Sequence, residues 1–84
     1  MYNSFISCNI RPFMFKQKVQ IFKDGKVITQ KEIPLNNLDE YIFYYCKQSE
    51  IHDVFLSGSK AYANKIKEKV ATNYEENDIQ IYLV

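Results

Sequence analysis

The sequence contains few of the residues that build disordered, disulfide-stapled or metal-bound proteins. Its 84 residues include two glycines, two prolines, two cysteines and one histidine, whereas 46% are hydrophobic and 15% are aromatic. A chain this apolar, with so little glycine and proline, is not of the disordered class. Its length predicts one small domain (1–84) with a single modest core and leaves no room for a second domain.

An excess of one charge and long apolar runs are also missing. Eleven Lys and Arg residues against ten Asp and Glu residues leave a net charge of +1, so no overall field draws the protein to nucleic acid or to an anionic membrane. No run reaches roughly 18 apolar residues, and the N-terminus lacks a secretory pattern. We therefore expect no membrane partner and a cytoplasmic location. Many Lys, Ile and Asn residues with a single Arg indicate an AT-rich coding sequence, as in low-GC bacteria and their phages.

Cysteine and histidine chemistry has little support in the sequence. Cys8 and Cys46 have neither a zinc-ligand spacing nor a C-x-x-C pairing, which favours core side chains in a reducing cytosol over a disulfide. His52 is the only histidine, and a nucleophile pair would require Cys8, Cys46 or Ser57 to meet it. We predict no catalytic residue, no metal site and no cofactor.

The first half of the chain has the alternation of β-strands. Strands are expected at 3–10 and 13–23, with Arg11-Pro12 between them, and Asp24-Gly25 predicts a type I′ hairpin leading into a third strand at 26–33. In the second strand one parity is apolar, which predicts that its members are buried: Phe13, Phe15, Val19 and Ile21. The alternative, a single-strand nucleic-acid surface, uses the same segment with its basic and aromatic residues: Arg11, Phe13, Met14, Phe15, Lys16 and Lys18.

The second half predicts two helices and two further strands. Asn37 and Glu40 have the spacing of an N-cap and its capping-box partner, and the helix that they begin ends near Ser49. A central strand covered on both faces is expected at 51–57, followed by a second helix and a last strand at 79–84. The predicted core residues are Val19, Ile21, Leu38, Ile42, Val54, Leu56, Ile66, Val70, Ile79 and Ile81.

A Ser-Gly-Ser-Lys turn joins the central strand to the second helix. Ser57, Gly58 and Ser59 can present successive N–H groups at a helix N-terminus, and Lys60 adds a positive charge, which predicts an anion or phosphate site. Ser59 is equally suited to be an N-cap, and glycine is common in strand-to-helix loops. The turn is therefore either a ligand site or a tight connection.

The predicted order, β-β-β-α-β-α-β, is a mixed α/β (α+β) sheet: an antiparallel meander extended by two right-handed crossovers. This order, with "VFLSGSKAYANKIKEKV", resembles the ribonuclease H-like core of the actin, Hsp70 and sugar kinase superfamily. Gly58 matches the first glycine of that superfamily's Gly-Gly turn, Ser59 replaces the second, and Ala63-Asn64 matches its small-residue and Asn positions. The resemblance implies a turn that approaches a nucleotide.

The motifs that would make this resemblance catalytic are missing. The superfamily's Asp-x-Gly phosphate hairpin has no counterpart in "SFISCNIRPFM", and the first strand carries no carboxylate for a two-metal nuclease site. Asp39 and Glu40 fall in the first turn of a helix, where acidic residues partner the helix dipole. The resemblance therefore implies a fold with a degenerate metal site.

These observations favour a non-catalytic interaction protein, an inhibitor or adaptor of phage or mobile-element origin that binds a protein partner. Seven tyrosines and six phenylalanines exceed what the predicted core needs, and four are candidate surface anchors: Tyr2, Phe43, Tyr44 and Tyr82. The last strand predicts a homodimer through a sheet edge. The alternative is a nucleotide- or nucleic-acid-binding module at Ser57–Lys60, and a degenerate hydrolase is a third reading.

Overall fold

The computed structural model describes residues 4–11, 15–74 and 78–84. Its elements are β1 (Phe5–Ile10), β2 (Lys16–Lys23), β3 (Lys26–Pro34), the short 3-10 helix η1 (Leu35–Asn37), α1 (Leu38–Ser49), β4 (Asp53–Gly58), α2 (Lys60–Asn73) and β5 (Gln80–Leu83). The prediction of a mixed α/β fold with two helices is confirmed. The predicted order of strands and helices is also the observed one.

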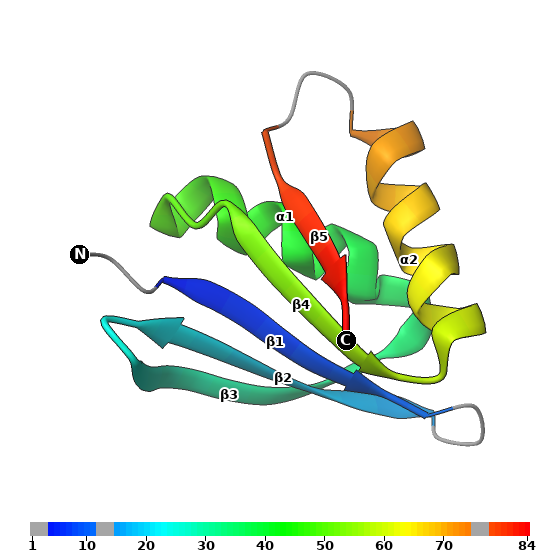
Figure 1. Cartoon of the computed structure of the whole chain (residues 1–84), viewed down its shortest axis with the longest axis horizontal. Coiled ribbons are helices and arrows are strands. Elements are labelled where there is room, and N and C mark those ends of the chain that lie inside the picture. The colour runs from blue at the N-terminus through cyan, green and yellow to red at the C-terminus, as the bar shows by residue number, and fades with distance from the viewer. Residues whose placement is uncertain (1–3, 12–14, 75–77) are drawn as a thin grey trace.

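The strands form one five-stranded sheet in the order β3-β2-β1-β4-β5 (Figure 1). β2 runs antiparallel to both β1 and β3, whereas β4 runs parallel to β1 and to β5. The sheet is thus mixed, with β1 at its centre and β3 and β5 as its outer strands.

The hairpin between β2 and β3 has the predicted conformation. Asp24 and Gly25 both have positive φ, 55° and 79°, as a type I′ turn requires. Lys23 pairs with Lys26 across the turn, and a bulge follows where the register shifts between Ile21 and Phe22.

Helix α1 ends at Ser49, as predicted, but its start differs in detail. η1 precedes it, and Asn37 occupies the N-cap position without a side-chain capping hydrogen bond, so the expected capping box does not form. At the other end Glu50 adopts the left-handed conformation, and the Ile51 amide donates to the Cys46 carbonyl. This closing turn directs the chain into β4.

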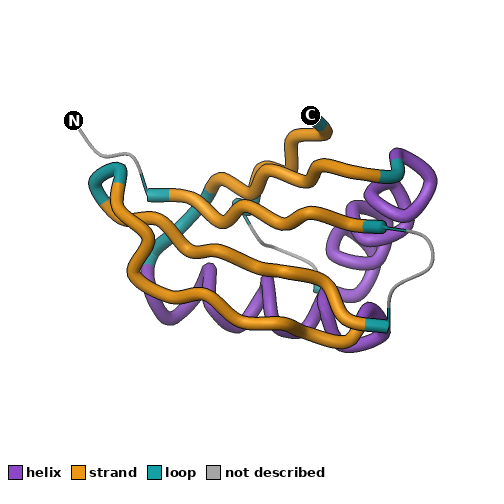
Figure 2. The backbone as a smooth tube through the Cα atoms, turned by 90° about the horizontal axis from the view of Figure 1, so that it is seen from below, coloured by secondary structure: helices purple, strands orange, loops and turns teal. Residues whose placement is uncertain are grey.

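Both helices cover the same face of the sheet (Figure 2). Burial alternates along β4, where Val54 and Leu56 are buried and Phe55 and Ser57 are only half-buried. The prediction that this strand is covered on both faces is therefore wrong. The crossovers from β3 to β4 and from β4 to β5 advance across the sheet in the same direction, and right-handed crossovers of that kind place their helices on one face. In the part of the chain described, no helix covers the other face.

The core lies between this sheet face and the two helices. Eight predicted core residues are buried, namely Val19, Ile21, Leu38, Ile42, Val54, Leu56, Ile66 and Val70. Ile79 and Ile81 are only half-buried, because β5 is an outer strand with one neighbour. Cys8 and Cys46 are buried, as expected of core cysteines, and the core also gains residues that the prediction omitted, chiefly Ile6 and Ile10 of the central strand.

The prediction that Phe15 is a core residue is also wrong. The strand was expected to begin at 13, but β2 begins at Lys16, so Phe15 precedes it and is 94% exposed. Gln17 takes the first inward position of the strand instead. Its Oε1 accepts a hydrogen bond from the Arg11 amide at 2.9 Å, and its Nε2 donates to the Arg11 carbonyl at 3.2 Å. The buried amide thus joins the end of β1 to the start of β2. Phe13 and Met14 lie outside the described residues.

Candidate functional site

The Ser57–Lys60 turn brings the end of β4 against the end of β1. Gly58 has φ of +99° and pairs with Ile10, and a Cβ on it would overlap the Ile10 carbonyl and lie 2.9 Å from Asn9 Oδ1. Only glycine fits both the dihedral and the space. The glycine that suggested a phosphate loop therefore has a packing role here.

The two serines of the turn also make internal contacts. The Ser57 hydroxyl donates to the Cys8 carbonyl at 3.4 Å, and the Ser59 amide donates to the Ile10 carbonyl at 2.7 Å. Ser59 occupies the N-cap position of α2 without a side-chain cap, and Lys60 is exposed. The Ser59 amide is thus already used by β1, and an anion here would rely on Lys60 and the amides that follow it.

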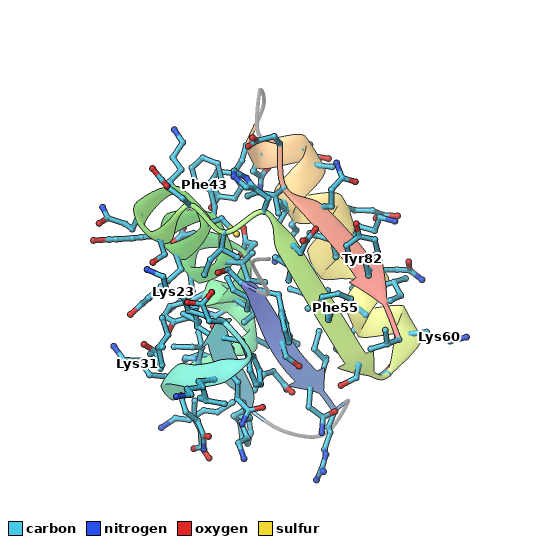
Figure 3. The ribbon with its side chains drawn as sticks, turned by 60° about the vertical axis from the view of Figure 1, so that its left-hand side comes forward. Lys23, Lys31, Phe43, Phe55, Lys60 and Tyr82 are labelled. Carbon is cyan, nitrogen blue, oxygen red and sulfur yellow. The ribbon has the colours of Figure 1, made fainter. Side chains whose placement is uncertain are left out.

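A row of aromatic rings crosses the face of the sheet that the helices leave open. Phe22 of β2 stacks on Phe5 of β1, with ring centroids 4.5 Å apart and planes 12° apart. Phe5 meets Phe55 of β4 edge to face at 5.1 Å, and Phe55 stacks on Tyr82 of β5 at 5.0 Å (Figure 3). We call these four residues the aromatic ladder. It spans four strands without a break.

The ladder continues at its β2 end as an apolar strip. Val27 pairs with Phe22 across the hairpin and is 45% exposed. The three phenylalanines are half-buried by one another, and Tyr82 is 44% exposed. A row of large apolar side chains therefore faces solvent on one side of the sheet.

The surroundings of the ladder are almost neutral. The open face carries neutral polar residues next to the rings, and the Gln20 amide donates to Gln30 at 3.1 Å. Farther along the same face Lys18 pairs with Glu32 across β2 and β3. Asp53 lies opposite Phe5 in the register of β4. No large field of one sign accompanies the rings.

The predicted aromatic anchors do not form one surface. Tyr82 belongs to the ladder, whereas Phe43 lies apart on α1, stacked on Tyr74 at 4.1 Å (Figure 3). Tyr44 is 52% exposed and lines a hollow of about 720 Å³ between α1 and β3, together with Tyr41 and Tyr45. Tyr2 lies outside the described residues.

Sequence reasoning missed three of the four ladder residues. Phe5, Phe22 and Phe55 have the strand parity opposite to that of the core, which was a usable signal. That they stand side by side depends on the register between strands, and the sequence did not specify it.

In the part of the chain that the structure describes, the side chains that could hold a metal are dispersed and both thiols are buried. Among the described residues, no three His, Cys, Asp or Glu side chains are close enough to hold a metal ion. Burial raises the pKa of Cys8 to about 12, and burial, with lesser contributions from Asp78 and Asp53, raises the pKa of Cys46 to about 12. Both thiols are free, so the alternative of a disulfide is wrong.

Asp39 and Asp78 have side-chain partners in the structure. Asp39 is buried and accepts a hydrogen bond from the Tyr74 hydroxyl at 3.5 Å, which ties α1 to the end of α2. Burial, followed by the charges of Asp39 and Glu40, raises the pKa of Tyr74. His52 and Asp78 form an exposed pair at 3.4 Å.

In comparisons with known proteins, no family model and no curated protein sequence matches this chain. Over the described residues, neither helix has the length and apolar character needed to cross a bilayer.

Proposed function

We propose that this protein is a non-catalytic interaction domain that binds a protein partner through the aromatic ladder. The observation that carries the proposal is the unbroken row Phe22–Phe5–Phe55–Tyr82 on the helix-free face of the sheet. A β-sheet ordinarily has both faces buried, or has one face buried and polar residues on the face that is exposed to solvent. Large apolar side chains in a contiguous patch are typical of an interaction site.

Ring orientation favours a protein over a single-stranded nucleic acid. Proteins that bind single strands stack bases on the faces of their aromatic side chains. Here the faces of Phe5 and Phe22 are turned to each other, as are those of Phe55 and Tyr82, so the ladder stacks upon itself. Its neutral surroundings also supply no channel for phosphates. Apolar side chains of a partner would pack on the ring edges and exclude water from them.

We also propose that the fold is ribonuclease H-like and the protein cytoplasmic. The antiparallel meander followed by two parallel crossovers supports the fold. The central strand, Phe5–Ile10, carries no carboxylate, although a nuclease of this fold would need one there. Two free, buried cysteines fit a reducing compartment. An inhibitor or adaptor role and a phage or mobile-element origin belong to the same proposal.

The test combines affinity capture with photo-cross-linking. The full chain, with a photoreactive phenylalanine analogue at position 82 or at position 44, is mixed with extract of the source cell. We expect a protein cross-linked from position 82 and not from position 44. Tyr82→Ser and Val27→Ser should abolish its capture, whereas Tyr44→Ser, an equally exposed control, should not.

The proposal fails if the captured protein cross-links equally from position 44 or remains bound to the Tyr82→Ser and Val27→Ser variants. It also fails if a single-stranded oligonucleotide shifts the resonances of the ladder and salt weakens that binding.

A further inference from the structure

A second surface, separate from the ladder, combines an apolar interior with a cationic rim. A groove of about 800 Å³ lies between α2, the start of β2 and the segment that joins β3 to α1. Its lining residues are Phe15, Lys16, Pro34, Leu35, Asn36, Tyr62, Lys65, Ile66 and Lys69. We call it the lysine-rimmed groove. It shares no residue with the ladder.

Phe15 is the unusual member of this groove. Its side chain is 94% exposed, although its backbone is held in place, because the Leu35 amide donates to the Phe15 carbonyl at 3.3 Å. Tyr62 and Leu35 are half-buried beside it, and Ile66 reaches the core. A phenylalanine whose backbone is fixed and whose side chain is exposed to solvent is available to bind a ligand.

The rim carries one sign of charge. Lys65 and Lys69 are one helical turn apart on α2, and Lys16 comes from β2. The Lys65 ammonium also lies 5.6 Å from the centre of the Tyr62 ring. Among the described residues, no Asp or Glu lines the groove and none of the three lysines forms an ion pair. The rim therefore complements a ligand with more than one negative charge.

We propose that the lysine-rimmed groove binds an acidic amphipathic peptide segment of a partner protein. An aromatic or aliphatic side chain of the peptide packs between Phe15 and Tyr62, and its carboxylates meet Lys65, Lys69 and Lys16. The lysines come from two separate elements, which suits several spaced carboxylates better than one phosphate. A wall formed by a solvent-exposed phenylalanine leaves the groove open, which suits a peptide better than an enclosed lipid chain.

To test this proposal, a random peptide library is displayed and selected for binding to the full chain. We expect the selected peptides to combine Asp or Glu with an aromatic or aliphatic residue. Fluorescein-labelled copies should shift the amide resonances of Phe15, Tyr62 and Lys65. Their binding should weaken as salt is added, because the contacts are ionic.

Matched variants locate the binding. Lys65→Glu and Lys69→Glu should each raise the Kd about tenfold. Lys67→Glu, the same charge change on the same helix but outside the groove, should change it less than about twofold. Phe15→Ser should weaken binding without a loss of stability, since the side chain is exposed, and Ile28→Ser is its exposed control.

Three results would overturn the proposal: selected peptides without an acidic residue, equal affinity for the Lys65→Glu and Lys67→Glu variants, or no selected peptide at all. Sodium dodecanoate that shifts the groove resonances where no acidic peptide does would assign the groove to a lipid instead. Because Tyr82→Ser leaves the groove intact, it should not change peptide binding, so failure of the ladder proposal and failure of this one are distinguishable.

Discussion

At the scale of single residues, Gly58 has a packing role that does not depend on whether its turn binds an anion. Gly58 was identified by its position between a strand and a helix, where phosphate loops occur. Its positive φ and its contact with Ile10 place it where β4 must approach the central strand closely. The requirement for glycine is explained by that approach, with or without a ligand.

Gly58→Ala should destabilise the domain by at least about 2 kcal/mol, because the new Cβ meets backbone and the dihedral is strained. Urea unfolding followed by circular dichroism measures the change. Gly25→Ala is the matched control: its φ is also positive, at +79°, but no atom lies within 4 Å of the added Cβ, so its cost should be about 1 kcal/mol. Equal losses in the two variants would contradict the packing role.

At the scale of elements, the two outer strands differ in how they are protected. β3 carries a bulge in its pairing with β2 and charged residues such as Lys31 and Glu32, and it ends at Pro34. These are the features by which natural sheets block edge pairing. β5 (Gln80–Leu83) has no charge, no proline and no bulge in its register with β4. The predicted homodimer would therefore form through β5.

Sedimentation velocity at increasing protein concentration tests this prediction, and we expect a dimer to appear. Gln80→Lys adds a charge to the β5 edge and should shift the protein toward monomer. Gln30→Lys, the same change on β3, should have no effect. A protein that stays monomeric at high concentration, or two variants that behave alike, would rule out pairing through β5.

At the scale of the whole molecule, one core contains both thiols, so their titration is tied to global unfolding. Burial raises the pKa of Cys8 and of Cys46 from 9.0 to about 12. Well below pH 9 both states keep the thiols protonated, and no stability is lost. Between about pH 9 and pH 12 the unfolded chain ionises its thiols and the folded protein does not, so stability falls.

The urea midpoint should therefore fall between pH 8 and pH 10, with each buried thiol contributing about 1 kcal/mol to the loss. Replacing both cysteines, with Cys8→Ala and Cys46→Ala, should make the fall in stability shallower. Part of the fall should remain, because the pKa values of Tyr41 and Tyr74 are also raised in the folded protein. A thiol reagent should label the protein at pH 8 only when urea is added. Rapid labelling of the folded protein would show that the thiols are accessible.

Local sequence patterns were sufficient for the kinds of elements and for most of the core. Strand alternation, the Asp24-Gly25 turn and the helical spacing of Leu38, Ile42, Ile66 and Val70 all act between residues close in the chain. Where the pattern failed, at Phe15, the alternation predicted a strand beginning at 13, whereas β2 begins at Lys16 and the Gln17 side chain hydrogen-bonds to Arg11 across the β1–β2 connection. The position at which β2 begins therefore depends on a contact between the ends of two strands, β1 and β2.

The surfaces were decided by the tertiary structure. The sequence by itself determined a small mixed α/β domain with more aromatic residues than its core needs. It did not determine that both crossovers leave the same sheet face open, or that the register of four strands places Phe22, Phe5, Phe55 and Tyr82 in one row. Nor did it bring Phe15 beside Lys65 and Lys69. The physical reason is that parity and periodicity fix which side of an element a residue occupies, whereas neighbours from distant segments depend on strand order, register and the packing of helices on the sheet.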